Sequence, residues 1–170
     1  MRSVRQDTRS AGTSRRWATL RSVRAEGAGL RPAEVWDRHG PAAYALASAL
    51  LGDEAAATQA VTLAMTDLAR SEDTVPAETA HRTLSRHVYA RSQELVDQTF
   101  RTLDLPPAMV WLGKLAPLQR ACLALCVFGG LTHQEAAELV DVPPMTVAEL
   151  LTAGLRDLSG LAAAEFSGNG

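Results

Sequence analysis

Cysteine, lysine and long apolar runs are all scarce in this chain of 170 residues. Two cysteines, Cys122 and Cys126, are too few for a disulfide framework, which excludes a small disulfide-held secreted protein and favours a reducing compartment. The longest apolar run, residues 121–131, is too short to cross a bilayer, and the N-terminus lacks the apolar core of a secretory signal. We therefore expect a cytoplasmic protein without a membrane partner.

Motifs that carry catalysis are also absent. The sequence contains no Gly-rich phosphate loop, no nucleophile elbow and no paired-carboxylate signature. Cys122 and Cys126 lie one helical turn apart in an apolar stretch, and His133 follows, but a zinc site needs a fourth ligand and a polar setting. Burial of the cysteines as small apolar residues fits this stretch better. We predict no enzyme, no metal site and no cofactor.

Basic residues are concentrated at the N-terminus. Residues 1–28 carry seven arginines against Asp7 and Glu26, a net charge of +5, whereas residues 29–170 carry 10 basic and 17 acidic groups, a net charge of −7. An acidic folded part argues against a broad nucleic-acid-binding surface. Residues 1–28 show no apolar period, so we predict a disordered basic arm, which is either a solvated tail or a phosphate-binding tail.

Apolar residues recur at helical spacing from residue 31 onward, and no strand pattern is found. A first helix is expected over 31–51, kinked or interrupted at Gly40-Pro41, with Trp36 on its buried stripe. Gly52 is expected to end this helix in a left-handed conformation. A second helix should follow, and a third should run from about residue 76 to 101.

The stretch over residues 108–160 predicts a helix-turn-helix. A short apolar helix precedes a longer one over 118–128, which Gly129-Gly130 should end. Thr132 and Glu135 have the spacing of a capping box, which would start a short helix.

The turn after this short helix is expected at Asp141, in a left-handed conformation that aspartate tolerates better than most residues. The last helix should begin at Pro143-Pro144 and run to about Leu158, with Gly160 as its end.

We predict an all-α fold of two small helical domains, a three-helix lobe followed by a helix-turn-helix lobe. A proline-containing linker with a reach of about 20 Å would join them. The predicted boundaries are a basic arm over 1–28, a first domain over 30–101, a linker over 102–107, a second domain over 108–160 and a tail over 161–170.

Four segments resemble the extracytoplasmic-function (ECF) sigma factors, the smallest class of bacterial sigma factor. Residues 35–44 and 50–53 resemble the first helix and corner of that family's polymerase-binding domain, known as region 2. Residues 115–120 resemble the opening of its promoter-binding domain, region 4, and residues 131–147 resemble its helix-turn-helix. The last match is the most specific, because spacing, caps and core positions agree together.

The resemblance implies a protein that binds core RNA polymerase and promoter DNA. An anti-sigma factor is a further candidate partner. The positions that match the family's polymerase contacts are Gln59, Thr62 and Met65. The basic face of the third helix would meet melted DNA, and the last helix would enter the major groove. The DNA-binding residues that we predict are Arg82, Arg86, Arg91, Thr146, Glu149, Thr152 and Arg156.

An alternative follows from the charge of the helix-turn-helix. Residues 131–158 contain one basic group, Arg156, against five acidic groups, a net charge of −4. A recognition helix normally needs arginine or lysine for phosphates and guanine edges. The alternative is a degenerate sigma mimic that binds an anti-sigma factor or RNA polymerase without reading DNA. Arg82, Arg86 and Arg91 would then belong to a solvated helix face.

Overall fold

The computed structural model describes residues 29–71, 73–96, 105 and 107–167. Secondary structure in this part of the chain is helical, apart from one isolated bridge between Leu30 and Val75. The predicted all-α class is therefore confirmed. The predicted basic arm over 1–28 lies outside the described residues, as does most of the predicted linker. The predicted domain boundaries remain predictions.

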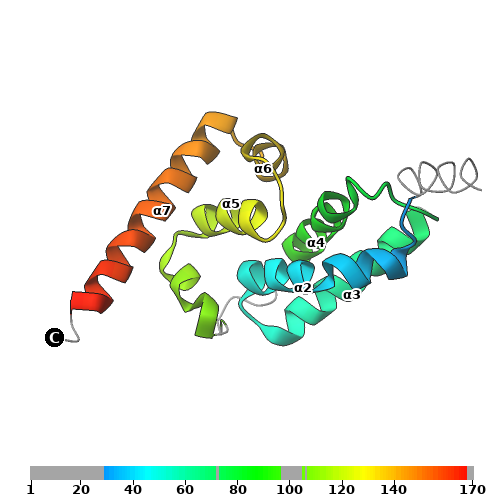
Figure 1. Ribbon diagram of the computed structural model, residues 1–170, viewed down its shortest axis with the longest axis horizontal. Helices are drawn as coiled ribbons and strands as arrows, with labels where there is room; N and C mark the ends of the chain where they lie inside the picture. The colour runs from blue at the N-terminus through cyan, green and yellow to red at the C-terminus, as the bar shows by residue number, and fades with distance from the viewer. Residues whose placement is uncertain (1–28, 72, 97–104, 106, 168–170) are drawn as a thin grey trace, which may run out of the picture.

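Helices α2 (Pro32–Leu51), α3 (Glu54–Ser71) and α4 (Ala80–Val96) pack against one another as a three-helix group (Figure 1). As predicted, α2 ends at Gly52 in a left-handed conformation with φ of 62°. Asp53 then caps α3, because its Oδ1 accepts a hydrogen bond from the Ala56 N–H at 2.7 Å. Gly52 and Asp53 therefore determine where the chain turns between α2 and α3.

Helix α2 differs from its prediction in two respects. It continues without interruption through Gly40-Pro41. Pro41 is exposed, so a carbonyl group that loses its helical partner there can bind water instead. Trp36 is 41% exposed, so the prediction that it is a core residue was wrong. Val35 takes the fully buried position, and Trp36, one residue later, points away from the core with its ring over Gly40.

Helix α4 begins at Ala80, four residues after the predicted start at Pro76. Residues 77–79 form a turn in which the Thr79 N–H donates to the Pro76 carbonyl at 3.0 Å. The predicted end of this helix, near residue 101, lies outside the described residues.

A second group follows, made of the 3-10 helix η1 (Pro107–Lys114) and helices α5 (Pro117–Val127), α6 (His133–Val140) and α7 (Pro144–Ser167). The predicted helix-turn-helix is present as α6 and α7, with α5 packed against both. The capping box of Thr132 and Glu135 forms, and Asp141 adopts the left-handed conformation, with φ of 54°.

Helix α7 is longer than predicted, because it continues past Leu158 and Gly160 to Ser167. A single glycine costs a helix only about 1 kcal/mol, and the alanine-rich sequence after Gly160 favours continuation.

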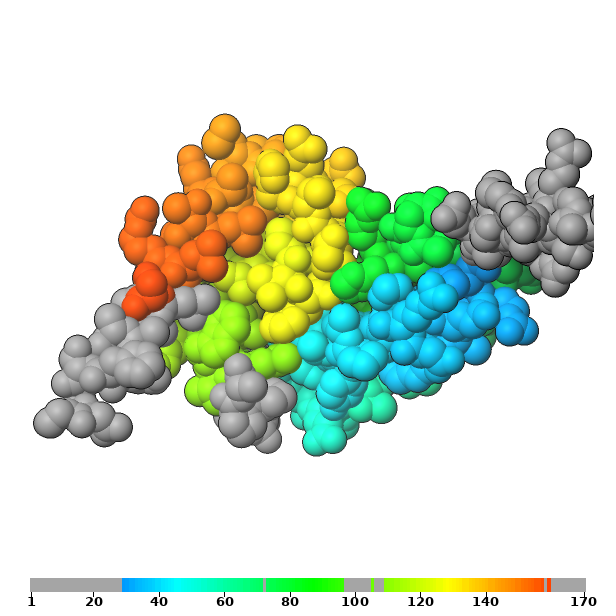
Figure 2. All heavy atoms as spheres, viewed as in Figure 1, coloured from blue at the N-terminus to red at the C-terminus, as the bar shows by residue number. Residues whose placement is uncertain are grey.

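The two groups of helices lie against each other. Helix α5 packs on α2, and one buried apolar cluster extends through both groups, with Leu46 and Leu125 among its fully buried members. Figure 2 shows the yellow surface of α5 and α6 meeting the green and blue surface of α4 and α2 without a gap. This arrangement brings α6 next to α4, and the candidate site lies between them.

Candidate nucleic-acid interface

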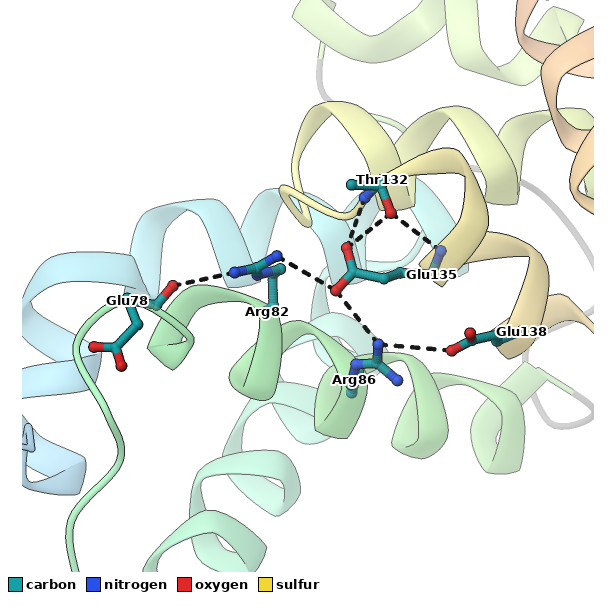
Figure 3. A network of polar contacts seen from close by, with 6 residues as sticks. All are labelled: Glu78, Arg82, Arg86, Thr132, Glu135 and Glu138. Carbon is teal, nitrogen blue, oxygen red and sulfur yellow. Dashed lines mark hydrogen bonds and ion pairs between the residues drawn. The ribbon is translucent and has the colours of Figure 1, made fainter.

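Two arginines on α4 face two glutamates on α6. Arg82 and Arg86 are four residues apart, so they share one face of α4, and Glu135 and Glu138 share the facing side of α6. Glu135 Oε1 lies 3.5 Å from Arg82 Nη1 and 3.6 Å from Arg86 Nη2, and Glu138 Oε2 lies 4.0 Å from Arg86 Nη2 (Figure 3). We call these four residues the α4–α6 contact.

Glu135 also forms hydrogen bonds at the N-terminus of α6. Its Oε2 accepts hydrogen bonds from the Thr132 N–H at 2.9 Å and from the Thr132 hydroxyl at 3.0 Å, which completes the capping box. The hydrogen bond from the Thr132 backbone is the main reason that the pKa of Glu135 lies below its ordinary value, and Arg82 and Arg86 lower it further. Glu135 is therefore a carboxylate at neutral pH, so it both caps α6 and attracts α4.

Next to this contact, two histidines stack where α2, α4 and α5 meet. The rings of His39 and His81 are parallel within 4°, with their centres 5.0 Å apart. His81 Nε2 lies 2.9 Å from the Phe128 carbonyl oxygen at the end of α5, so this nitrogen is the donor. Burial, followed by the nearby His81, lowers the pKa of His39.

Gly130 lies against the same histidine. Its φ is 63°, and a β-carbon at this position would come within 2.7 Å of His81 Nδ1. Both the left-handed conformation and the close approach require glycine here. The chain between α5 and α6 is thus held directly on α4.

The third predicted arginine of α4 points elsewhere. Arg91 Nε donates to Asp67 Oδ2 on α3 at 2.5 Å, and its Nη1 donates to Glu94 Oε2 at 2.7 Å. The hydrogen bond from Arg91 is the main reason that the pKa of Asp67 lies below its ordinary value, and the same bond raises the pKa of Arg91. Arg91 therefore does not join Arg82 and Arg86 in the α4–α6 contact.

Helix α7 presents a nearly neutral outer face. Four side chains spaced at helical intervals are exposed along it: Met145, Glu149, Thr152 and Arg156. The Thr152 hydroxyl donates to the Ala148 carbonyl at 2.8 Å, and Thr146 is half-buried. The described part of the second group carries only two further arginines or lysines, Lys114 and Arg120. Burial lowers the pKa of the half-buried Arg120.

An apolar groove runs along α2 and α3 on the first group. Its volume is about 660 Å³, and its lining includes Trp36, Val61, Thr62 and Met65. Two of the three predicted polymerase-binding residues, Thr62 and Met65, thus lie in the groove, while Gln59 is exposed on α3 outside the lining.

Comparison with known proteins agrees with this geometry. Residues 111–158 match the family described as sigma-70, region 4. Most of the second group of helices is therefore similar to sigma-70 region 4. Among solved structures, the chain is similar to that of CnrH in complex with the cytosolic domain of CnrY, with a TM-score of 0.58 and 22% identity over 78% of this chain and 88% of that chain. No curated protein sequence matches the chain. The family match supports a sigma-type helix-turn-helix in the second group, and the likeness to CnrH supports the fold.

Sequence reasoning identified the individual parts of the second group but missed how it meets the first group. It assigned Glu135 to the capping box alone, and it gave His39 and Glu138 no role in the site. Sequence reasoning also placed Trp36 in the core instead of on the surface. Its position directly after the buried Val35 in the helical pattern indicated that it faces away from the core.

Two further properties of the described residues bear on the site. No helix among them is long and apolar enough to cross a membrane. Within the same ranges, no three histidine, cysteine or acidic side chains gather as a group that could hold a metal ion. Cys122 is buried and Cys126 half-buried, and burial raises the pKa of both thiols.

Proposed function

We propose that the protein is a non-enzymatic transcription factor of the ECF sigma type, which binds core RNA polymerase and contacts promoter DNA. The observation that carries this proposal is the complete helix-turn-helix within the region 4 match. Its capping box, its left-handed turn residue and its buried Val147 are all in place. A reading helix needs this scaffold to approach the major groove.

The groove on α2 and α3 supports the polymerase half of the proposal. It offers apolar surface beside polar side chains, with the exposed Trp36 at its side and Arg70 as a charged lining residue. Aromatic and methionine side chains are enriched where proteins bind proteins. We assign polymerase binding to this groove, with Thr62 and Met65 in it and Gln59 nearby on α3.

The DNA half depends on two surfaces. Arg82 and Arg86 on α4 supply guanidinium groups for the backbone of melted DNA, and α7 supplies Thr146, Glu149, Thr152 and Arg156 for a duplex. Glu149 can accept a hydrogen bond from a cytosine amino group. Arg91 is engaged with Asp67 and Glu94, so we give it a supporting place at the edge of the α4 surface.

A second candidate function is a sigma mimic that binds proteins and does not read DNA. The nearly neutral α7 face, with Arg156 as its one basic group, favours this candidate because phosphate binding needs positive charge. CnrH was solved bound to the cytosolic domain of CnrY, and a corresponding partner of anti-sigma type fits both candidates. In both cases we propose that the protein acts in the cytoplasm.

Binding across a salt series separates the two candidates. We expect the purified chain to bind core RNA polymerase, and the complex to bind promoter-sized duplexes with an affinity that falls steeply as salt rises. Absence of duplex binding at low salt, both alone and with polymerase, would sink the sigma-factor candidate.

A reporter in cells gives an independent test. If transcription depends on this protein and is abolished by Arg82→Glu with Arg86→Glu, the mimic is excluded. A matched pair, Arg38→Glu with Lys114→Glu, reverses two exposed basic residues outside the α4–α6 contact and outside the groove, and should leave the reporter active.

A further inference from the structure

The outer face of α7 begins with an apolar side chain to which the proposed function gives no role. Met145 lies in the first turn of α7 and is 70% exposed. No other large apolar side chain in the described part of the chain is as exposed. Covering an apolar side chain with another apolar group is favourable, because it removes both surfaces from water. A ligand that covers Met145 therefore gains binding free energy.

Met145 shares its face of α7 with Glu149 and Thr152, whereas Val147 is buried on the opposite side. The Thr152 hydroxyl donates its hydrogen to the Ala148 carbonyl at 2.8 Å, so this hydrogen is already used within the helix. A carboxylate has no hydrogen to donate. The first part of the face therefore offers apolar surface and hydrogen-bond acceptors, and its one basic group, Arg156, comes last.

This chemistry fits some base edges of the DNA major groove and not others. Thymine presents a methyl group there, and adenine and cytosine each present an amino donor, whereas guanine presents two acceptors. The acceptors of guanine would meet the carboxylate of Glu149 without a donor to pair with. The N-terminal residues of a recognition helix are the ones that contact base edges. Met145 occupies such a position, and its matching group is the thymine methyl.

We propose that Met145 is a specificity-determining residue that packs on a thymine methyl group in the major groove. This inference rests on the proposed function for its ligand, duplex DNA, and deepens that function by naming the base that α7 selects. Contact between two apolar groups needs no positive charge. Such readout is therefore compatible with a helix that carries a single arginine, and it separates sequences by contact with bases instead of by attraction to phosphates.

The surroundings of Met145 favour a base edge over a protein partner. Protein-binding faces usually present a large contiguous apolar patch. Along the outer face of α7 the polar residues Glu149 and Thr152 follow directly, so the apolar surface does not continue along the helix. A thymine methyl group needs only one apolar side chain, and the amino group of a neighbouring base pair can donate to Glu149.

Replacement of thymine by uracil gives a direct test, because the two bases differ only by this methyl group. The probes are two labelled 20-base-pair duplexes of alternating sequence, one of adenine and thymine and the other of adenine and uracil. Each base pair then carries or lacks the methyl group wherever the protein binds, and the two duplexes have the same charge. Binding of the full chain is measured by fluorescence anisotropy at low salt.

We expect the wild type to bind the thymine duplex about 3- to 10-fold more tightly than the uracil duplex. Met145→Ala should bring this ratio close to one, and Met145→Leu should keep part of it. Leu155→Ala is the matched control, because it truncates an apolar side chain that is 60% exposed on another face of α7. Equal affinities in the wild type, or a preference that survives Met145→Ala, would overturn the inference.

Methyl resonances of methionine provide a second readout that detects weak binding. The chain has four methionines, and the signal of Met145 is assigned by its loss in Met145→Leu. We expect this signal to shift more with the thymine duplex than with the uracil duplex. The signal of Met65, which lies in the groove on the first group, should stay in place. A Met145 signal that bound duplex leaves unmoved would overturn the inference.

These measurements separate the inference from the proposed function. If neither duplex binds, with or without core RNA polymerase, the DNA half of the proposed function fails and the inference fails with it. If both duplexes bind with equal affinity, the DNA half stands and the role of Met145 is wrong. If Met145→Ala weakens binding to core RNA polymerase and leaves the thymine-to-uracil ratio unchanged, Met145 contacts protein and the inference is overturned.

Discussion

Helices α4 and α7 would both meet nucleic acid in a sigma-type protein, but they have retained different properties. Helix α4 carries three arginines, each paired with carboxylates from α3, α4 or α6. Helix α7 is held in helix-turn-helix geometry, but Arg156 is the only basic residue on it. The arginines of α4 are engaged by carboxylates, whereas the outer face of α7 is exposed but carries a single arginine.

This difference shows that scaffold and surface depend on different residues. The position of α7 rests on buried apolar side chains and on caps, none of which needs a basic outer face. The charge of α4 rests on arginines that other elements can approach. A match to the region 4 family therefore establishes the scaffold, whereas the surface has to be tested residue by residue.

The largest expected effect comes from breaking the scaffold below α7. Leu123 on α5 is fully buried, and its Cδ1 lies near Gly154 of α7, so Leu123→Ala should lower the free energy of unfolding by about 2–5 kcal/mol. Urea denaturation followed by circular dichroism measures it. Leu118→Ala, on the same helix but largely exposed, should cost below about 1 kcal/mol. Equal costs would mean that the core below α7 is not packed as described.

The cap of α6 gives the next effect. Thr132→Ala removes the hydroxyl that accepts from the Glu135 N–H, and we expect a loss of about 1 kcal/mol in unfolding free energy. Thr132→Ser keeps the hydroxyl and should retain most of the stability. A loss of the same size in both variants would assign the effect to the methyl group of Thr132 instead of the cap.

Adding a positive charge to α7 tests whether the lack of basic residues limits its affinity for DNA. Glu149→Lys on the exposed face should raise the affinity for an arbitrary duplex at low salt by about 3- to 10-fold and steepen its salt dependence. Asp73→Lys, with the same charge change in the loop after α3, is the matched control. An equal gain in both variants would show that net charge matters and that α7 holds no privileged position on DNA.

The smallest expected effect concerns pH. The folded state lowers the pKa of His39 below its ordinary value of 6.5, so the unfolded chain binds more protons as pH falls below 6.5. The contribution of His39 to stability is therefore fully present above pH 6.5 and is lost below it. We expect His39→Gln to flatten the dependence of thermal stability on pH between pH 5 and 7. A dependence as steep as that of the wild type would contradict this contribution of His39.

Much of the fold was predictable because local rules determine it. The left-handed Gly52 and Asp141 and the capping box of Thr132 and Glu135 depend on neighbours within a few residues. Two of the helix errors arose where solvent exposure or the following sequence overrides a local rule. Pro41 is tolerated because it faces solvent, and Gly160 because a good helix-forming sequence follows it.

The candidate site was less predictable because its contacts join distant parts of the chain. Arg82 and Glu135 are 53 residues apart, and His81 and Phe128 are 47 apart. Spacing shows that Arg82 and Arg86 share a helix face, but it does not show what lies opposite that face. The roles of the individual residues in polymerase and DNA binding remain predictions.

Gly130 makes the packing between the two groups of helices sensitive to a single atom. Any side chain there would begin with a carbon 2.7 Å from His81 Nδ1, so the His81 ring, the turn or the two groups of helices would have to move. The φ of 63° adds backbone strain for most residues other than glycine. We therefore expect sequences that keep this packing to keep glycine at this position.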